Sequence, residues 1–229
     1  MYNANRHNTQ YAIRNTHLIT PKVWMANTTY SMSFTTATLL YHESLTVAGL
    51  YAELGDWDAV REKVIAQNLL QMRTLNSSRR IYQEVTSRLK LLTPGQMALL
   101  RQGSRQEQNY LLWLAICKRY RFIYDFAAEV VREKYLRLDL DLAAGDYDAF
   151  FNAKAEWHPE VERVATSTRV KQRQFLFKIM REAELLAGDH QIVPAVLTPS
   201  LIEAIETDDP AHFAIFPVRG WVHGIDTRI

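Results

Sequence analysis

The sequence contains little cysteine, glycine or proline, and each shortage excludes a class of structure. Among its 229 residues there is one cysteine, Cys117, so no disulfide can form within the chain. The lack of disulfides is typical of proteins from a reducing compartment, and we expect a cytoplasmic protein. Only 8 glycines and 7 prolines are present, whereas a β-sandwich or barrel needs many short turns. The composition therefore favours a few long helices.

Long apolar runs are missing as well. The longest, Tyr110 to Cys117, has eight residues, whereas a transmembrane helix needs roughly 20. The first segment, Met1 to Trp24, is polar and lacks the apolar core of a signal peptide. We therefore expect no membrane contact and no export, and a compact part that follows a polar N-terminal arm, residues 1–29.

The sequence motifs of the common enzyme classes are also absent. The chain has no G-x-G-x-x-G, no phosphate loop ending in G-K-[ST], no H-E-x-x-H, no C-x-x-C and no G-x-S-x-G. The acidic cluster Asp139 to Asp148 does not match a calcium loop, since Phe150 stands where the closing carboxylate is needed. Cys117 lies inside the apolar run, which predicts a buried, inert thiol. We therefore expect no enzyme activity, no catalytic residue, no metal, no cofactor and no small-molecule substrate.

What the chain does have is apolar residues at helical spacing along most of its length, which predicts an all-α fold. This spacing and the capping residues predict helices over 34–54, 56–72, 76–92, 94–102, 106–118, 119–138, 146–157 and 159–186, and a short one from 199. Residues 192–197 and 214–225 are expected to be extended, the second as a small strand or hairpin. The expected architecture is a compact multi-helix bundle: a core, 30–190, of two packed halves, 30–104 and 105–190, with a C-terminal extension, 191–229, packed on it.

Charge is segregated along the chain, although the net charge is only +2. Residues 56–90 hold seven Lys or Arg against four acids, residues 101–137 hold eight against four, and residues 163–181 hold six against none. Residues 138–162 carry seven acids and one Lys, and residues 182–210 carry seven acids without Lys or Arg. A near-neutral total therefore conceals a surface with separate basic and acidic regions.

Two predicted helices carry most of the candidate binding residues. In 159–186 a basic stripe lies apart from the apolar arc, and in 76–92 the cations lie off the apolar face. Aligned Lys and Arg can neutralise several phosphates, so the partner that they indicate is a polyanion. The alternatives are a solvated surface, or docking to acidic faces of other proteins or of a second copy. The predicted DNA-binding residues are Arg73, Arg79, Arg80, Arg88, Lys90, Arg163, Arg169, Lys171, Arg173, Lys178 and Arg181.

Three blocks of sequence carry a family resemblance: Tyr30 to Thr36, Asn76 to Leu89, and Leu111 to Tyr124 followed by Phe126 to Val131. Together they resemble the BrxA family, the small protein of BREX bacteriophage-exclusion operons. The resemblance extends over roughly Tyr30 to Asp208. It leaves the N-terminal arm and the tail unexplained.

The resemblance implies a fold and a partner that the residues alone leave open. It implies an all-helical fold similar to the RNA-binding antitermination factor NusB, and binding of double-stranded DNA within a bacterial antiviral defence system, without enzyme activity. The expected function is contact with the DNA backbone through basic helices, with little sequence specificity. Expected protein partners are a methyltransferase, a large ATPase and a phosphatase-like protein. Assembly of the BREX complex and RNA binding are the alternative functions.

Overall fold

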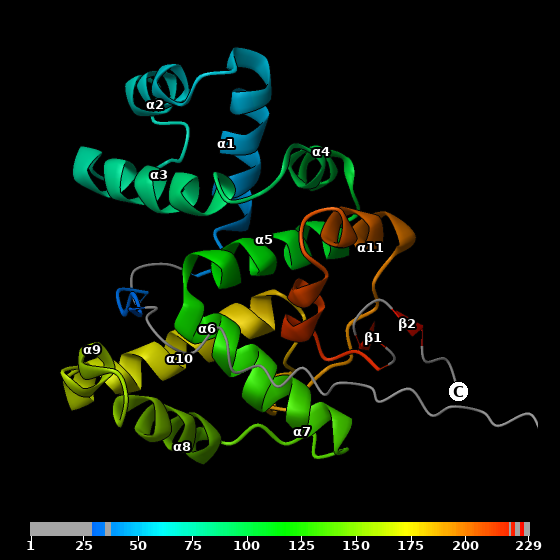
Figure 1. The fold of residues 1–229 in the computed structure, drawn as a ribbon. Helices are drawn as coiled ribbons and strands as arrows, with labels where there is room; N and C mark the ends of the chain where they lie inside the picture. Colours follow the sequence, from blue (N-terminus) through cyan, green and yellow to red (C-terminus); the bar gives the residue numbers. More distant parts are fainter. Residues whose placement is uncertain (1–28, 35–37, 220, 223–224, 227–229) are drawn as a thin grey trace, which may run out of the picture.

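The structure is a computed structural model that describes residues 29–34, 38–219, 221–222 and 225–226. The predicted arm, residues 1–29, lies outside this part except for its last residue. Helices dominate, as predicted, and they are arranged in two groups around α5 (Figure 1). Their bounds are α1 Tyr41–Leu54, α2 Trp57–Ala66, α3 Leu75–Leu89, α4 Pro94–Gln102, α5 Arg105–Arg119, α6 Arg121–Phe126, α7 Arg132–Leu136, α8 Ala144–Ala155, α9 Pro159–Glu162, α10 Thr166–Glu182 and α11 Pro199–Glu206.

Short irregular elements complete the fold. A π-helical turn, Ala127–Val131, joins α6 to α7, and a 3-10 helix, Pro210–Ile215, follows α11. A hairpin is present at the end of the predicted segment 214–225, since β1 (Trp221–Val222) pairs antiparallel with β2 (Ile225–Asp226), whereas the first two residues of that segment belong to the 3-10 helix. Residues 192–197, predicted to be extended, contain no helix, and Ile192 forms an isolated antiparallel bridge with Leu186.

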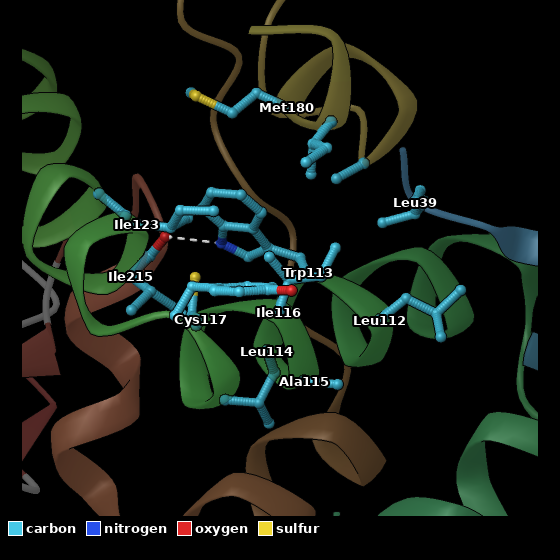
Figure 2. Close-up of a cluster of buried hydrophobic side chains, with 14 of the residues drawn as sticks. Leu39, Leu112, Trp113, Leu114, Ala115, Ile116, Cys117, Ile123, Met180 and Ile215 are labelled. Atoms are coloured by element: carbon cyan, nitrogen blue, oxygen red, sulfur yellow. Dashed lines mark hydrogen bonds between the residues drawn. The ribbon is translucent and has the colours of Figure 1, made fainter. Parts of the chain in front are cut away.

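Helix α5 is the centre of the core, because its sequence is apolar on all sides. All of its residues from Tyr110 to Cys117 are buried, and such a helix must be enclosed by others. Figure 2 shows Trp113 of α5 packed among side chains from α6, α10 and the C-terminal segment. The Trp113 indole N–H donates a hydrogen bond to the carbonyl oxygen of Ile215 at 3.1 Å. The buried hydrophobic residues thus form one cluster that extends along the chain from Tyr30 to Val218.

Polar contacts attach the first described residues to this core. The Tyr30 hydroxyl donates to Asp125 at 2.7 Å, and the Tyr30 backbone N–H donates to Glu160 at 2.8 Å. Farther along, the carbonyl of Thr38 accepts from Arg88 of α3, and the N–H of Leu39 donates to Glu182 of α10. The segment before α1 therefore ties α3 to α10.

Several predicted helix boundaries were wrong, each for a local reason. The predicted helix 34–54 begins only at Tyr41, after Leu40 in the left-handed region. Thr74, not the Asn76 to Ser78 group, caps α3, since its hydroxyl accepts from the Ser77 N–H. Asp146 lies inside the first turn of α8 and not at its cap. From there its carboxylate accepts a hydrogen bond from the Ala143 N–H at 2.7 Å.

The predicted helix 159–186 is in fact two helices, α9 and α10. Ala165 is extended (φ −60°, ψ 145°) and interrupts it. The neighbouring Val164, Thr166, Ser167 and Thr168 are β-branched or hydroxyl residues, which favour helix ends over helix interiors. The second helix ends at Glu182, and Glu184 then adopts a positive φ of 61°.

Candidate nucleic-acid interface

The solvent face of α3 gathers arginine and amide side chains. Ile81, Val85 and Leu89 point into the core, which leaves the opposite side of this amphipathic helix exposed. Positions three and four apart on a helix lie on one face. The exposed residues on that face are Asn76, Arg79, Arg80, Gln83 and Lys90.

The arginines at the start of α3 are available to a ligand. Arg73, in the loop before α3, and Arg79 and Arg80, in its first turns, are exposed. None of these three guanidinium groups has an acidic partner within 4.0 Å in the described part of the chain. Lys90, at the other end, lies over the Trp57 ring at 5.4 Å and keeps its charge exposed. The positive charge of this face is therefore not neutralised internally.

Helix α3 packs on its neighbours through one face and leaves the other face open to solvent. It packs on α1, α2 and α5, and the eight residues 67–74 connect it to α2. In helix-turn-helix proteins the second helix of such a pair contacts DNA through its N-terminal residues. The connection here is longer than the usual three or four residues, but the free arginines lie in the N-terminal part of α3.

The second basic face is on α10. Lys171, Gln174 and Lys178 are exposed along one side, and Arg181 is half-buried at the end of the same stripe. Lys178 lies 3.8 Å from Glu182, a loose surface pair of small energetic value. Gln172, Leu176 and Ile179 are buried on the other side. Arg163 is exposed but lies at the end of α9, outside the stripe.

Three predicted binding residues have structural partners instead. Arg88 is 3% exposed, pairs with Glu84 at 2.7 Å and donates to the Thr38 carbonyl. Arg169 and Arg173 both pair with Asp148 of α8, at 3.0 and 2.7 Å. These guanidinium groups are already satisfied by internal acceptors, so we remove the three residues from the candidate set. Arg169 and Arg173 instead fix α10 against α8.

The two basic faces do not merge into one continuous helix surface. Figure 1 shows α3 and α10 on opposite sides of α5, with which both are in contact. The sequence-based candidates omitted the amides Asn76 and Gln83, which extend the α3 face, although their spacing from Arg79 and Arg80 was visible. They also omitted Arg61 of α2, which is exposed.

Two kinds of reactive group can be checked directly, metal-binding clusters and the cysteine thiol. No group of three or more His, Cys, Asp or Glu side chains there could hold a metal ion. Burial raises the pKa of the Cys117 thiol well above its usual range, so this cysteine is not a nucleophile at neutral pH. Among the helices that the structure describes, none combines the length and the apolarity needed to cross a membrane.

Comparison with known proteins finds a protein family that matches most of the chain. The family model BrxA matches residues 28–209. A BREX protein BrxA from Escherichia coli O9:H4 is 27% identical over 63% of this chain and 68% of its own length. A BREX protein BrxA from Bacillus cereus is 27% identical over 64% of this chain and 74% of its own.

A solved structure has the same fold. The crystal structure of an uncharacterized protein from Magnetospirillum magneticum superposes with a TM-score of 0.71 and 22% sequence identity. The match covers 82% of this chain and 98% of that one. At this identity the likeness concerns the fold.

Proposed function

The chain belongs to the BrxA family of BREX proteins, and from its surface we propose that it binds double-stranded DNA without catalysing a reaction. The contacts are made with the phosphate backbone and show little sequence specificity. They are supplied by Arg79, Arg80 and Lys90 of the α3 face and by Arg73 in the loop before α3. On α10 they are supplied by Lys171, Lys178 and Arg181. In this role the protein acts in the bacterial cytoplasm, as part of a system that defends the cell against bacteriophages.

The observation that carries this proposal is the unpaired state of the α3 arginines. Arg88 at the far end of the same helix and Arg169 on α10 have carboxylate partners within 3.0 Å, whereas Arg79 and Arg80 have none among the described residues. Guanidinium groups left free on one helix face can each release counterions from DNA. The amides of Asn76 and Gln83 can hydrogen-bond to phosphate oxygens between them.

A gel-shift titration of duplex DNA at two or more salt concentrations tests the proposal. We expect affinity to fall steeply with salt, and two duplexes of unrelated sequence to bind alike. In the double variant Arg79→Ala/Arg80→Ala, the slope of log affinity against log salt should fall by about 2, since each phosphate contact contributes about 0.9.

A matched control removes the same charge elsewhere. Arg101 of α4 and Arg137, after α7, are both exposed, and Arg101→Ala/Arg137→Ala should leave the salt slope unchanged. Salt-insensitive binding, or equal losses in the two double variants, would refute the role of α3. Competition between duplex DNA and duplex RNA of equal length decides between the DNA and RNA functions.

A further inference from the structure

The corner between α8 and α9 exposes a tryptophan. Trp157 is 81% exposed, the largest exposed fraction among the big hydrophobic side chains in the described part of the chain. Two other tryptophans whose burial the structure describes are covered, Trp113 fully and Trp57 partly. An indole can remove a large apolar area from water when a partner covers it.

The backbone that carries Trp157 is held in place. The N–H groups of Trp157 and His158 both donate to the carbonyl of Lys154, at 3.2 and 3.0 Å. The Lys154 ammonium pairs with Glu129 at 2.7 Å, and the His158 ring lies 4.3 Å from the ring of Tyr30. The indole therefore projects from a fixed support, which lowers the entropic cost of burying it in an interface.

The border of this corner is acidic. Glu156 and Glu162 are exposed and have no basic partner within 4.0 Å among the described residues. Glu160, between them, accepts from the Tyr30 N–H and from His158. Arg163 is the one exposed cation within six residues of Trp157. Phosphates would be repelled here, whereas a surface bearing Lys or Arg would be attracted.

The corner also lies away from the α3 face. Figure 1 shows α8 and α9 at the end of the molecule opposite α1, α2 and α3. DNA on the α3 face would leave Trp157 uncovered.

We propose that the Trp157 corner, formed by Glu156, Trp157, Glu160 and Glu162, is a docking surface for a protein that presents an apolar pocket bordered by Lys or Arg. Tryptophan is enriched among the residues that dominate protein–protein binding energy, and such residues fill pockets in the partner. The surrounding carboxylates steer and orient the basic rim. This surface is separate from the α3 face, so DNA held on α3 leaves the corner free for a protein (Figure 1).

The first test is co-purification with the other proteins of its BREX system, expressed together with tagged full-length chain and treated with nuclease. We expect one of them to bind the wild type directly. Trp157→Ala should weaken that binding by about thirtyfold or more, the effect of losing a dominant interface residue. Leu138→Ala is the matched control, because Leu138 is also an exposed apolar residue, at 67%, in a different loop. It should leave binding unchanged.

Charge reversal tests the chemistry assigned to the partner. Glu156→Lys/Glu162→Lys should weaken the same complex and reduce its association rate. Trp157→Ala and Glu156→Lys/Glu162→Lys should both leave the affinity for duplex DNA and the melting temperature of the protein no lower than in the wild type, since these side chains are exposed. Complexes that form equally with all variants, or no BREX protein bound by the wild type, would overturn the proposal.

Other occupants of the corner give distinct results. If Trp157→Ala weakens DNA binding instead, the tryptophan belongs to the nucleic-acid interface and the proposal is wrong. If the difference between wild-type and Trp157→Phe fluorescence shows an indole shielded from iodide in the isolated chain, another part of the chain covers it. A concentration-dependent dimer lost in Trp157→Ala would assign the surface to a second copy. Each of these three outcomes would overturn the proposal that a different protein occupies the corner.

Discussion

At the scale of single residues, burial decides which arginines hold the fold and which face outward. Arg88 and Arg80 are on the same helix, eight residues apart, yet Arg88 is enclosed with Glu84 and the Thr38 carbonyl while Arg80 is exposed. Glu84 also accepts from the Tyr120 hydroxyl at 2.7 Å. Removing Arg88 would leave a shielded carboxylate without its counter-charge.

Arg88→Met should therefore destabilise the protein by about 3 to 5 kcal/mol, the usual effect of removing one partner from a buried ion pair. Thermal or urea unfolding, followed by circular dichroism, measures the loss. Arg80→Met is the control and should change stability by less than about 0.5 kcal/mol. An Arg88 variant as stable as the wild type, but with weaker DNA binding, would return this residue to the binding surface.

The sequence could not separate these roles, because the deciding partners are distant along the chain. Glu84 is visible four residues before Arg88, but Thr38 is 50 residues away. Asp148 likewise lies 21 and 25 residues before the arginines that it binds. Helical spacing places a side chain on a face of its own helix. It does not reveal what another helix brings opposite that face.

At the scale of elements, capping residues located some helix starts and not others. Asp56, Thr93 and Thr198 each accept from a backbone N–H at the start of a helix, whereas the caps predicted at Asn76 to Ser78 and at Asp146 were wrong. The break between α9 and α10 was missed because the apolar spacing continues through it, although its β-branched and hydroxyl residues disfavour a helix interior. Spacing reports which face is apolar and says less about where a helix stops.

One cap also joins two elements and gives the protein a pH-dependent contact. Glu107 of α5 accepts hydrogen bonds from the Thr198 hydroxyl, which caps α11, and from the Ser104 N–H at 2.7 Å. These donors hold the pKa of the Glu107 carboxyl below its usual 4.5. Because the folded pKa is lowered, the stabilisation is present above the unfolded pKa and is lost as pH falls through the folded value.

Glu107→Gln should reduce stability by about 1 kcal/mol at pH 7, since a neutral amide accepts these bonds less well. The difference from wild type should shrink as pH falls below 4.5 and through the lowered pKa of the folded protein, because the wild-type carboxyl then also becomes neutral. Urea unfolding at a series of pH values measures both curves. Glu203→Gln, at an exposed site on α11, is the control. A difference that stays constant down to pH 3 would show that the charge of Glu107 is not what matters.

At the scale of the whole molecule, α5 determines how the basic faces are placed. The helix is buried along most of its length, so α3 and α10 pack against it and direct their charged sides away from it. The basic stripes of α3 and α10 are visible in the sequence as charge patterns. Their positions on opposite sides of α5 depend on tertiary packing, which no single-helix pattern contains (Figure 1).

This arrangement makes a quantitative prediction for DNA that touches both faces. Lys171→Ala/Lys178→Ala should lower the salt slope by about 2, as the α3 double variant does, and the fourfold variant should lower it by about 4. The free-energy losses should add within about 0.5 kcal/mol, because the two sets share no partner. Gel shifts at three salt concentrations measure the salt slope and the loss of binding free energy for each variant.

If the α10 lysines have no effect while the α3 arginines retain theirs, DNA contacts one side of α5 only. A loss in the fourfold variant that is no larger than in either double variant would instead indicate that each face needs the other. Additivity, with far-UV circular dichroism unchanged in all variants, is the result expected when both faces contact DNA, either one duplex that bends around the molecule or two separate duplexes (Figure 1).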